Sequence, residues 1–161
     1  MLRTRRTELR KVSGIAGVLL LLAAMMGAQT LPATATNSSD AEAAIRAELN
    51  AQLLAWNRGD LRGYMQGYWQ SPELTFFAGD QASAGWEAAY QRYRAAYVGK
   101  GRGMGKLEFG KLQVEVLSPD AAFVRGSWQL TMKDGSKRRG LFTVVLKRFD
   151  EGWRIIHDHS S

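Results

Sequence analysis

A strand-like apolar core and both histidines of the chain meet in one stretch, Trp153-Arg154-Ile155-Ile156-His157-Asp158-His159-Ser160-Ser161. Its aromatic and β-branched residues predict a strand, in which successive side chains point to opposite faces. Strict alternation places four residues on one face: Trp153, Ile155, His157 and His159. Asp158 is then expected to point to the other face. We expect this strand to close a pocket built by the residues before it.

Working backwards, the hydrophobic period is two as far as Lys106, which predicts strands at 107–117, 121–132, 137–149 and 153–159. Short turns such as Asp134-Gly135 separate these long strands, and this arrangement indicates antiparallel hairpins. Within 121–132 apolar residues alternate with polar ones, so one face of the sheet is expected to be apolar.

Helices are predicted before these strands. The first begins at a capping pattern, Ser39 followed by Glu42, and its apolar residues recur at i, i+4, i+8 and i+11 from Ile45 to Trp56. A glycine ends it, and Asp60 is expected to cap a second, short and aromatic helix over 61–69.

A short strand over 74–77 and a loop are expected next, followed by a third helix over 86–97. This helix carries an aromatic stripe on one side and Arg92 among polar residues on the other. Three helices followed by an antiparallel meander predict an α+β fold in which the helices cover one face of the sheet.

The N-terminus is typical of a secretory signal peptide: a basic segment to Lys11, an apolar run over 12–26 and then small residues. We expect cleavage after Ala35, which gives a signal peptide over 1–35 and an exported, periplasmic or secreted, domain over 40–161. The apolar run is shorter than the roughly twenty residues that span a bilayer, so no permanent membrane anchor is expected. Retention of the leader as an anchor, and twin-arginine export through Arg5-Arg6, stay open.

The formal net charge of +7 is concentrated in the leader, and the remaining Lys and Arg residues are scattered among acids. A nucleic-acid partner is therefore not expected. The absence of cysteine excludes a disulfide framework and a lipid-modified cysteine. The glycine-rich segment 99–106 lacks the spacing of nucleotide-binding loops, since Leu107 stands where Ser or Thr is required, so no cofactor is predicted.

Two segments resemble a known family: Ala55-Trp56-Asn57-Arg58-Gly59-Asp60, and Arg148-Phe149 followed by 152–161. Together with the element order they resemble the nuclear transport factor 2-like superfamily, in its branch of SnoaL-like and ketosteroid-isomerase-like domains, over residues 40–161. The resemblance implies a cone of about three helices packed on a strongly curved antiparallel sheet around a pocket. It also implies a homodimer formed through the sheet.

Ketosteroid isomerase chemistry needs a carboxylate base, a tyrosine and a protonated aspartic acid. On the simplest match to that family, the tyrosine position is Gln52, the base position is Ala78 and the second acid position is Val145. Steroid isomerisation is therefore not expected.

The resemblance and the aromatic stripes predict a pocket that binds a small apolar or aromatic molecule. Its candidate ligand-binding residues are Trp56, Tyr64, Tyr68, Phe76, Trp86, Tyr90, Arg125 and Trp128.

His157 and His159 are the candidate catalytic residues, because a neutral imidazole can act as a base or anchor a ligand. A purely structural role for both histidines is the alternative. No third ligand stands at a recognisable spacing from them, so a metal site is not expected.

Three functions remain open at this point. The first is an exported small-molecule-binding domain, and the second is an isomerase, cyclase or lyase that uses a pocket histidine as general base. The third is a homo-oligomerisation domain.

Overall fold

The computed structural model describes residues 33–99 and 103–161. Residues 1–32 of the predicted leader lie outside this part of the chain. Among the described helices, none combines the length and the apolar character needed to cross a bilayer.

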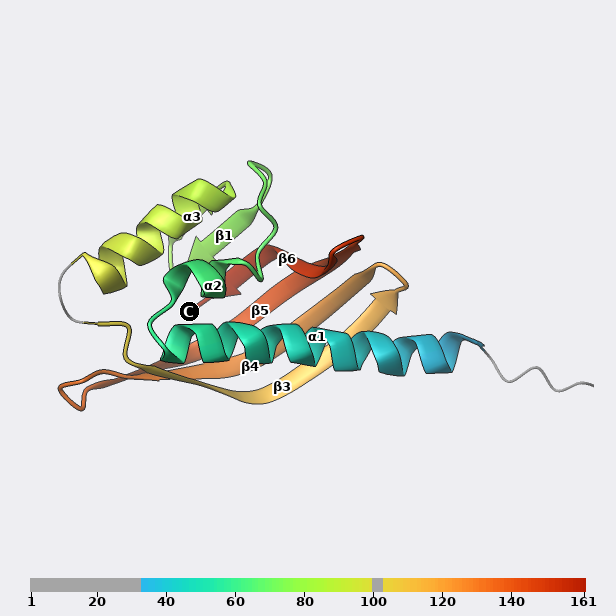
Figure 1. Ribbon diagram of the computed structural model, residues 1–161, viewed down its shortest axis with the longest axis horizontal. Helices are drawn as coiled ribbons and strands as arrows, with labels where there is room; N and C mark the ends of the chain where they lie inside the picture. Colours follow the sequence, from blue (N-terminus) through green and yellow to red (C-terminus); the bar gives the residue numbers. More distant parts are fainter. Residues whose placement is uncertain (1–32, 100–102) are drawn as a thin grey trace, which may run out of the picture. The chain divides into compact units, whose positions relative to one another are not determined.

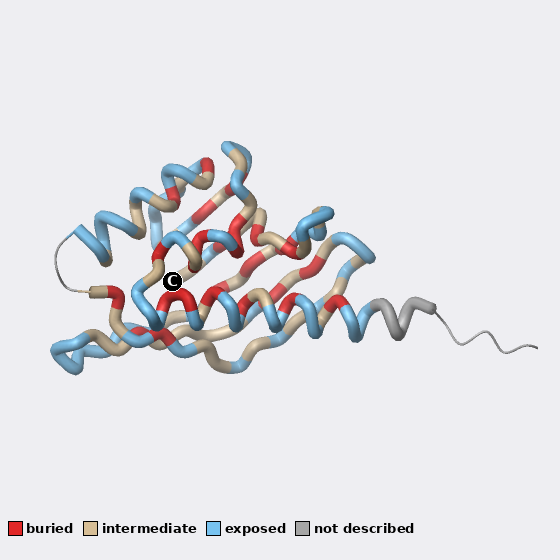
Figure 2. Tube along the Cα trace, in the orientation of Figure 1, coloured by how far each residue is buried: buried red, intermediate tan, exposed pale blue. Residues whose placement is uncertain are grey.

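Helix α1 (Ala33–Asn57) begins before Ser39, so the predicted start at a capping box is wrong. A helix gains one backbone hydrogen bond with each residue added, so a nucleated helix runs through an isolated capping pattern. The predicted apolar stripe is confirmed, because Ile45, Leu49 and Trp56 are buried. Figure 2 shows buried segments recurring along this helix.

Helix α2 (Leu61–Met65) is capped by Asp60 as predicted, since the backbone N–H of Gly63 donates to its carboxylate at 2.7 Å. The helix is shorter than expected. Ile155 takes the backbone groups that a longer helix would use: its N–H donates to the Gly67 carbonyl and its carbonyl accepts from the N–H of Trp69, both at 2.9 Å.

A hairpin of β1 (Thr75–Ala78) and β2 (Gln81–Ala84) follows. The prediction of a loop over β2 is wrong, because this strand is held by backbone pairing and its short, mostly exposed side chains carry no strand-like pattern. Helix α3 (Trp86–Tyr93) continues into a π-helix, η1 (Arg94–Val98), and together they cover the predicted third helix.

The long strands are β3 (Lys106–Ser118), β4 (Ala121–Thr131), β5 (Lys137–Phe149) and β6 (Gly152–Ser160), close to their predicted ranges. They form one six-stranded sheet in the order β2-β1-β6-β5-β4-β3. All neighbours pair antiparallel except β1 and β6, which are parallel. Figure 1 shows the three α-helices on the same side of this sheet, which confirms the predicted α+β cone.

A β-bulge in β6 changes which side chains face the helices. Val145 of β5 pairs with His157, but the next residue, Leu146, pairs with Ile155, so Ile156 is left without a partner. One extra residue shifts the alternation of every side chain after it. The predicted common face of Trp153, Ile155 and the histidines is therefore wrong, and it is Asp158 that joins the buried face.

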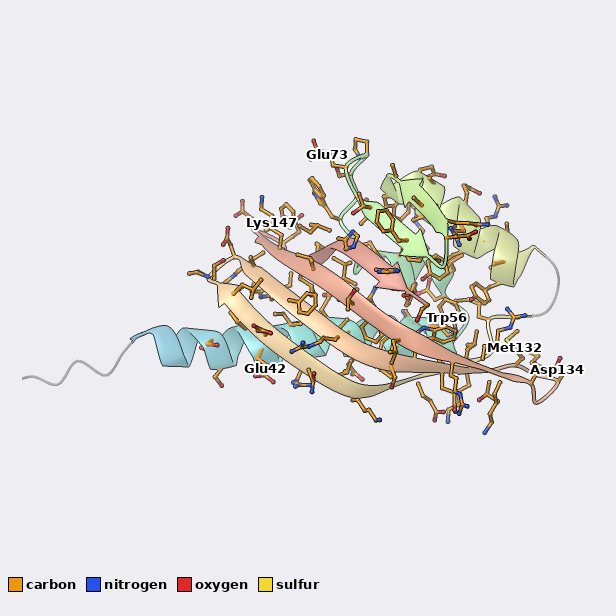
Figure 3. All side chains as sticks on the ribbon, turned by 180° about the vertical axis from the view of Figure 1, so that it is seen from behind. Glu42, Trp56, Glu73, Met132, Asp134 and Lys147 are labelled. Carbon is orange, nitrogen blue, oxygen red and sulfur yellow. The ribbon has the colours of Figure 1, made fainter. Side chains whose placement is uncertain are left out.

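The opposite, outer face of the sheet is seen from the front in Figure 3. Leu141, 67% exposed, and Phe77, 39% exposed, lie on this face, since their strand neighbours Phe142 and Phe76 are buried on the other. Homodimerisation through the sheet stays a prediction.

Candidate functional site

A cavity of 290 Å³ lies between the sheet and the helices. Nine aromatic side chains contribute to its wall: Trp56, Tyr64, Tyr68, Phe76, Tyr93, Tyr97, Phe109, Trp128 and Phe142. Gly79, Ala96 and Ser161 also line it and are exposed, so they mark its mouth. The volume is close to the lower end of the range of about 300–1,000 Å³ for small-molecule pockets. The cavity therefore suits a small, ring-sized molecule.

Helices α1, α2 and α3, the last with its continuation η1, supply one side of the cavity, and Trp56 joins their aromatic rings. Trp56, near the end of α1, donates from its indole N–H to the Met104 carbonyl at 3.0 Å and packs edge-on against Tyr64 and Tyr97, with ring centroids 4.9 Å away in each case. Figure 3 labels Trp56 on the helix side of the sheet. These contacts fix the aromatic wall in one arrangement.

Asp158 is the carboxyl group inside this aromatic wall. It is 4% exposed, lines the cavity and sits opposite Phe76 of β1 in the sheet. The Tyr68 hydroxyl donates to its Oδ2 at 2.7 Å, and the Ser160 hydroxyl donates to its Oδ1 at 2.8 Å. Both oxygens are thus held in place, and each keeps a second lone pair for a ligand.

Burial raises the pKa of Asp158 from 3.8 to about 6, against the opposing effects of the bonds from Tyr68 and Ser160 and of the nearby His159. Desolvation disfavours the charged form of a carboxyl group, and here it outweighs two hydrogen bonds that favour it. Asp158 therefore changes charge near neutral pH, unlike an ordinary surface aspartate.

A chain of tyrosine hydroxyls extends from Asp158 into the cavity. The hydroxyls of Tyr64 and Tyr68 are 3.3 Å apart, and Tyr93 interacts with both. Burial raises the pKa of Tyr64 to about 12 and raises those of Tyr68 and Tyr93 well above 10. All three phenols stay protonated at neutral pH and act as hydrogen-bond donors.

The predicted ligand-binding residues divide into two groups. Trp56, Tyr64, Tyr68, Phe76 and Trp128 line the cavity, whereas Trp86, Tyr90 and Arg125 do not.

The three residues outside the cavity each have other partners, so their predicted place in the pocket is wrong. Trp86 stacks on Tyr90 with centroids 5.2 Å apart and donates to the Met65 carbonyl at 2.9 Å. Arg125 lies on the other face of β4 from Val124 and Trp128, where its guanidinium is 3.5 Å from the Glu115 carboxylate.

Neither histidine lines the cavity, and the expectation that His157 or His159 faces it is wrong. The Nδ1 atom of His157 lies 2.6 Å from the Thr75 hydroxyl, and both imidazoles pack edge-on against Phe77 on the outer face. Burial and the neighbouring His159 lower the pKa of His157 below 6.5. Within residues 33–99 and 103–161, no cluster of three His, Asp or Glu side chains could hold a metal ion.

Prediction from the sequence missed Asp158, Arg92 and Tyr93 as cavity residues. Arg92 was expected on the outward side of its helix, but its long side chain reaches back over the Phe76 ring, with the guanidinium carbon 5.7 Å from the ring centroid. Gln52 and Ala78, the positions of the isomerase tyrosine and base in the family resemblance, also line the cavity. The carboxyl group of this cavity, Asp158, thus comes from β6, whereas the position of the isomerase base, Ala78, lies in β1.

Comparison with known proteins agrees with this architecture. An NTF-2 like protein of unknown function from Shewanella oneidensis is 36% identical, with 74% of this chain and 98% of that chain covered and a TM-score of 0.69. An NTF2-like superfamily protein from Salmonella enterica is 24% identical over 80% of this chain and 92% of that chain, with a TM-score of 0.63.

An NTF2-like protein of unknown function from Pseudomonas putida is 22% identical over 77% of this chain and 87% of that chain, with a TM-score of 0.66. No curated protein sequence matches the chain. The model of the SnoaL-like domain matches residues 45–161, which hold the whole cavity wall. The chain therefore belongs to the SnoaL-like domain family, within the nuclear transport factor 2-like superfamily.

Proposed function

We propose that this protein binds a small, ring-containing molecule in the aromatic cavity and that Asp158 hydrogen-bonds the polar atom of that molecule. The observation that carries the proposal is the placement of Asp158, a buried carboxyl group in an otherwise largely aromatic and aliphatic wall. Such a group lowers the stability of the fold, because burial disfavours its charged form. A function in binding explains why a group with this cost is present.

The aromatic wall supports the same proposal. Rings packed edge-on against one another form a rigid surface that contacts a flat ligand at little cost in conformational entropy. A purely structural oligomerisation domain has no need of a cavity that keeps a carboxyl group and three phenol hydroxyls inside. The small-molecule function is therefore favoured over oligomerisation alone.

The experiment compares two neighbouring valines of β5. Val144 lines the cavity and is buried, whereas Val145 points to the outer face. We expect Val144→Phe to reduce the cavity volume and weaken binding of neutral one-ring phenols and ketones at least roughly tenfold, because the larger side chain occupies space that the ligand needs. Val145→Phe should leave their affinity unchanged. Calorimetric titration of both folded variants and the parent is the measurement, and equal affinities for the two variants would place the ligand outside the cavity.

A second candidate function is proton transfer catalysed by Asp158. Its pKa of about 6 is suited to a general base near neutral pH. This enzyme of isomerase or lyase type would use Asp158 in place of the histidines. If it exists, Asp158→Asn should abolish exchange of ketone α-protons in heavy water, while His157→Asn should not change it.

Export also belongs to the proposal, because the basic, apolar and small-residue segments before residue 40 follow the order of a secretory leader. We expect the mature protein to begin near Thr36 and to lie outside the cytoplasm. N-terminal sequencing of the protein from its native host tests this. An intact Met1 in the cytoplasmic fraction would refute it.

A further inference from the structure

Arg92 of α3 places a positive charge in the cavity wall. Its side chain is half-buried and lies over Phe76, and most of the other residues that line the cavity are apolar or aromatic. A guanidinium stacked on a ring face keeps its edge N–H groups free, and these groups match the two oxygens of a carboxylate.

Arg92 forms no ion pair with any carboxylate of residues 33–99 and 103–161. By contrast, Arg154, which is also half-buried, lies 3.5 Å from the Glu48 carboxylate. A cation that is partly removed from water without a counter-charge is costly, and an anionic ligand would remove that cost.

The two charged groups of the cavity act on different parts of it. Burial raises the pKa of Tyr97 against the opposing effects of Arg138 of β5 and of Arg92, whereas the influences on Asp158 come from burial, Tyr68, Ser160 and His159. Arg92 and Tyr97 border Ala96, which is exposed at the mouth, while Asp158 is buried. The cavity thus holds a cationic group beside its mouth and a separate, buried carboxyl group.

We infer that the ligand is a small aromatic carboxylic acid, whose carboxylate pairs with Arg92 at the mouth and whose ring fills the aromatic wall. This inference rests on the proposed function and specifies the class of molecule. A hydroxyl group on the far side of the ring donates a hydrogen bond to Asp158. The carboxylate of the ligand does not lie beside Asp158, since the ionised Asp158 would repel it. The cavity of 290 Å³ has room for a one-ring acid and not for a long-chain fatty acid.

The test uses matched pairs of probes: benzoate, 4-hydroxybenzoate and 4-hydroxycinnamate, each beside its neutral primary amide. Calorimetric titration at pH 7.5 gives the affinity of the purified protein for each member of a pair. We expect at least one acid to bind roughly tenfold more tightly than its amide, as a charge-assisted bidentate contact implies. Arg92→Gln should remove this difference by weakening the acid and leaving the amide nearly unchanged. Arg94→Gln is the matched control, because Arg94 is exposed and does not line the cavity.

The outcomes separate this inference from the proposed function. If amides bind as tightly as acids and Val144→Phe weakens both, the cavity binds rings but Arg92 does not select an acid, and only the inference fails. If Arg94→Gln weakens the acids as much as Arg92→Gln does, the effect is a general one of net charge and the inference also fails. If neither acids nor amides bind the parent protein, both the inference and the proposed function are overturned for molecules of this size.

Discussion

Asp158→Asn is expected to stabilise the protein at pH 8 by about 3 kcal/mol, the free energy that corresponds to a pKa raised from 3.8 to about 6. Asparagine has the shape of the protonated carboxyl group and can still accept the hydrogen bond from Tyr68. The Ser160 hydroxyl can turn to accept one from the new amide. The variant therefore keeps the contacts and loses the buried charge.

The effect has a defined pH window. Between about pH 4 and 6 the folded protein holds a proton on Asp158 that the unfolded chain has lost, because burial raises the pKa of this carboxyl group. Its contribution to stability is fully present below pH 3.8 and is lost as the pH rises through about 6. The stability of the parent should thus fall relative to the variant as the pH rises from 4 to 8.

Urea unfolding of both proteins at pH 4, 6 and 8 is the measurement. Asp40→Asn is the control, because Asp40 is an exposed aspartate near the start of the described part of α1, and it should show no such gain. If the free energies of unfolding of the parent and of Asp158→Asn differ by the same amount at all three pH values, the carboxyl group is not desolvated.

Trp56→Ala should have the largest destabilising effect, a loss of roughly 3–5 kcal/mol, as is usual when a buried Trp or Phe is truncated. Trp56 is 3% exposed and packs edge-on against three tyrosines, and its removal leaves the Met104 carbonyl without its indole donor. It also joins α1 to the segment that leads into β3. Its loss should lower the thermal midpoint and enlarge the cavity.

Trp69 offers the comparison for this variant. It is only half-buried and stacks on Phe149 with centroids 5.5 Å apart, outside the cavity. Trp69→Ala should therefore lower the thermal midpoint clearly less than Trp56→Ala does, as measured by differential scanning calorimetry. Equal losses for the two variants would mean that the aromatic wall around Trp56 contributes no more than a surface stack.

Hydrophobic periodicity was sufficient to predict the meander and α1 from the sequence, because both depend on local patterns. Alternation between apolar and polar residues located β3 to β6 within a few residues, and the spacing of Ile45, Leu49 and Trp56 located the buried side of α1. The short backbone-paired strand β2 has no such pattern and was missed.

The place of Asp158 in the site could not be predicted in the same way, because it depends on one residue of β6 that has no partner in β5. Ile155 and Ile156 are both apolar and β-branched, so the sequence does not show that one of them is extra. The bulge is set by pairing with β5 and β1, which a single strand's pattern does not contain. The error reversed the roles of Asp158 and the histidines. The adjacent isoleucines interrupt the alternation, but they do not show whether a residue is extra or which one it is.

The central claim is that Asp158 is a desolvated carboxyl group facing the ligand cavity, and carbon-13 NMR of labelled aspartate measures it directly. The Asp158 carboxyl resonance, assigned by its absence from the Asp158→Asn spectrum, should titrate near pH 6. It should also shift when a cavity ligand is added. A resonance that titrates near 4 and does not respond to any ligand that binds the parent would contradict the claim.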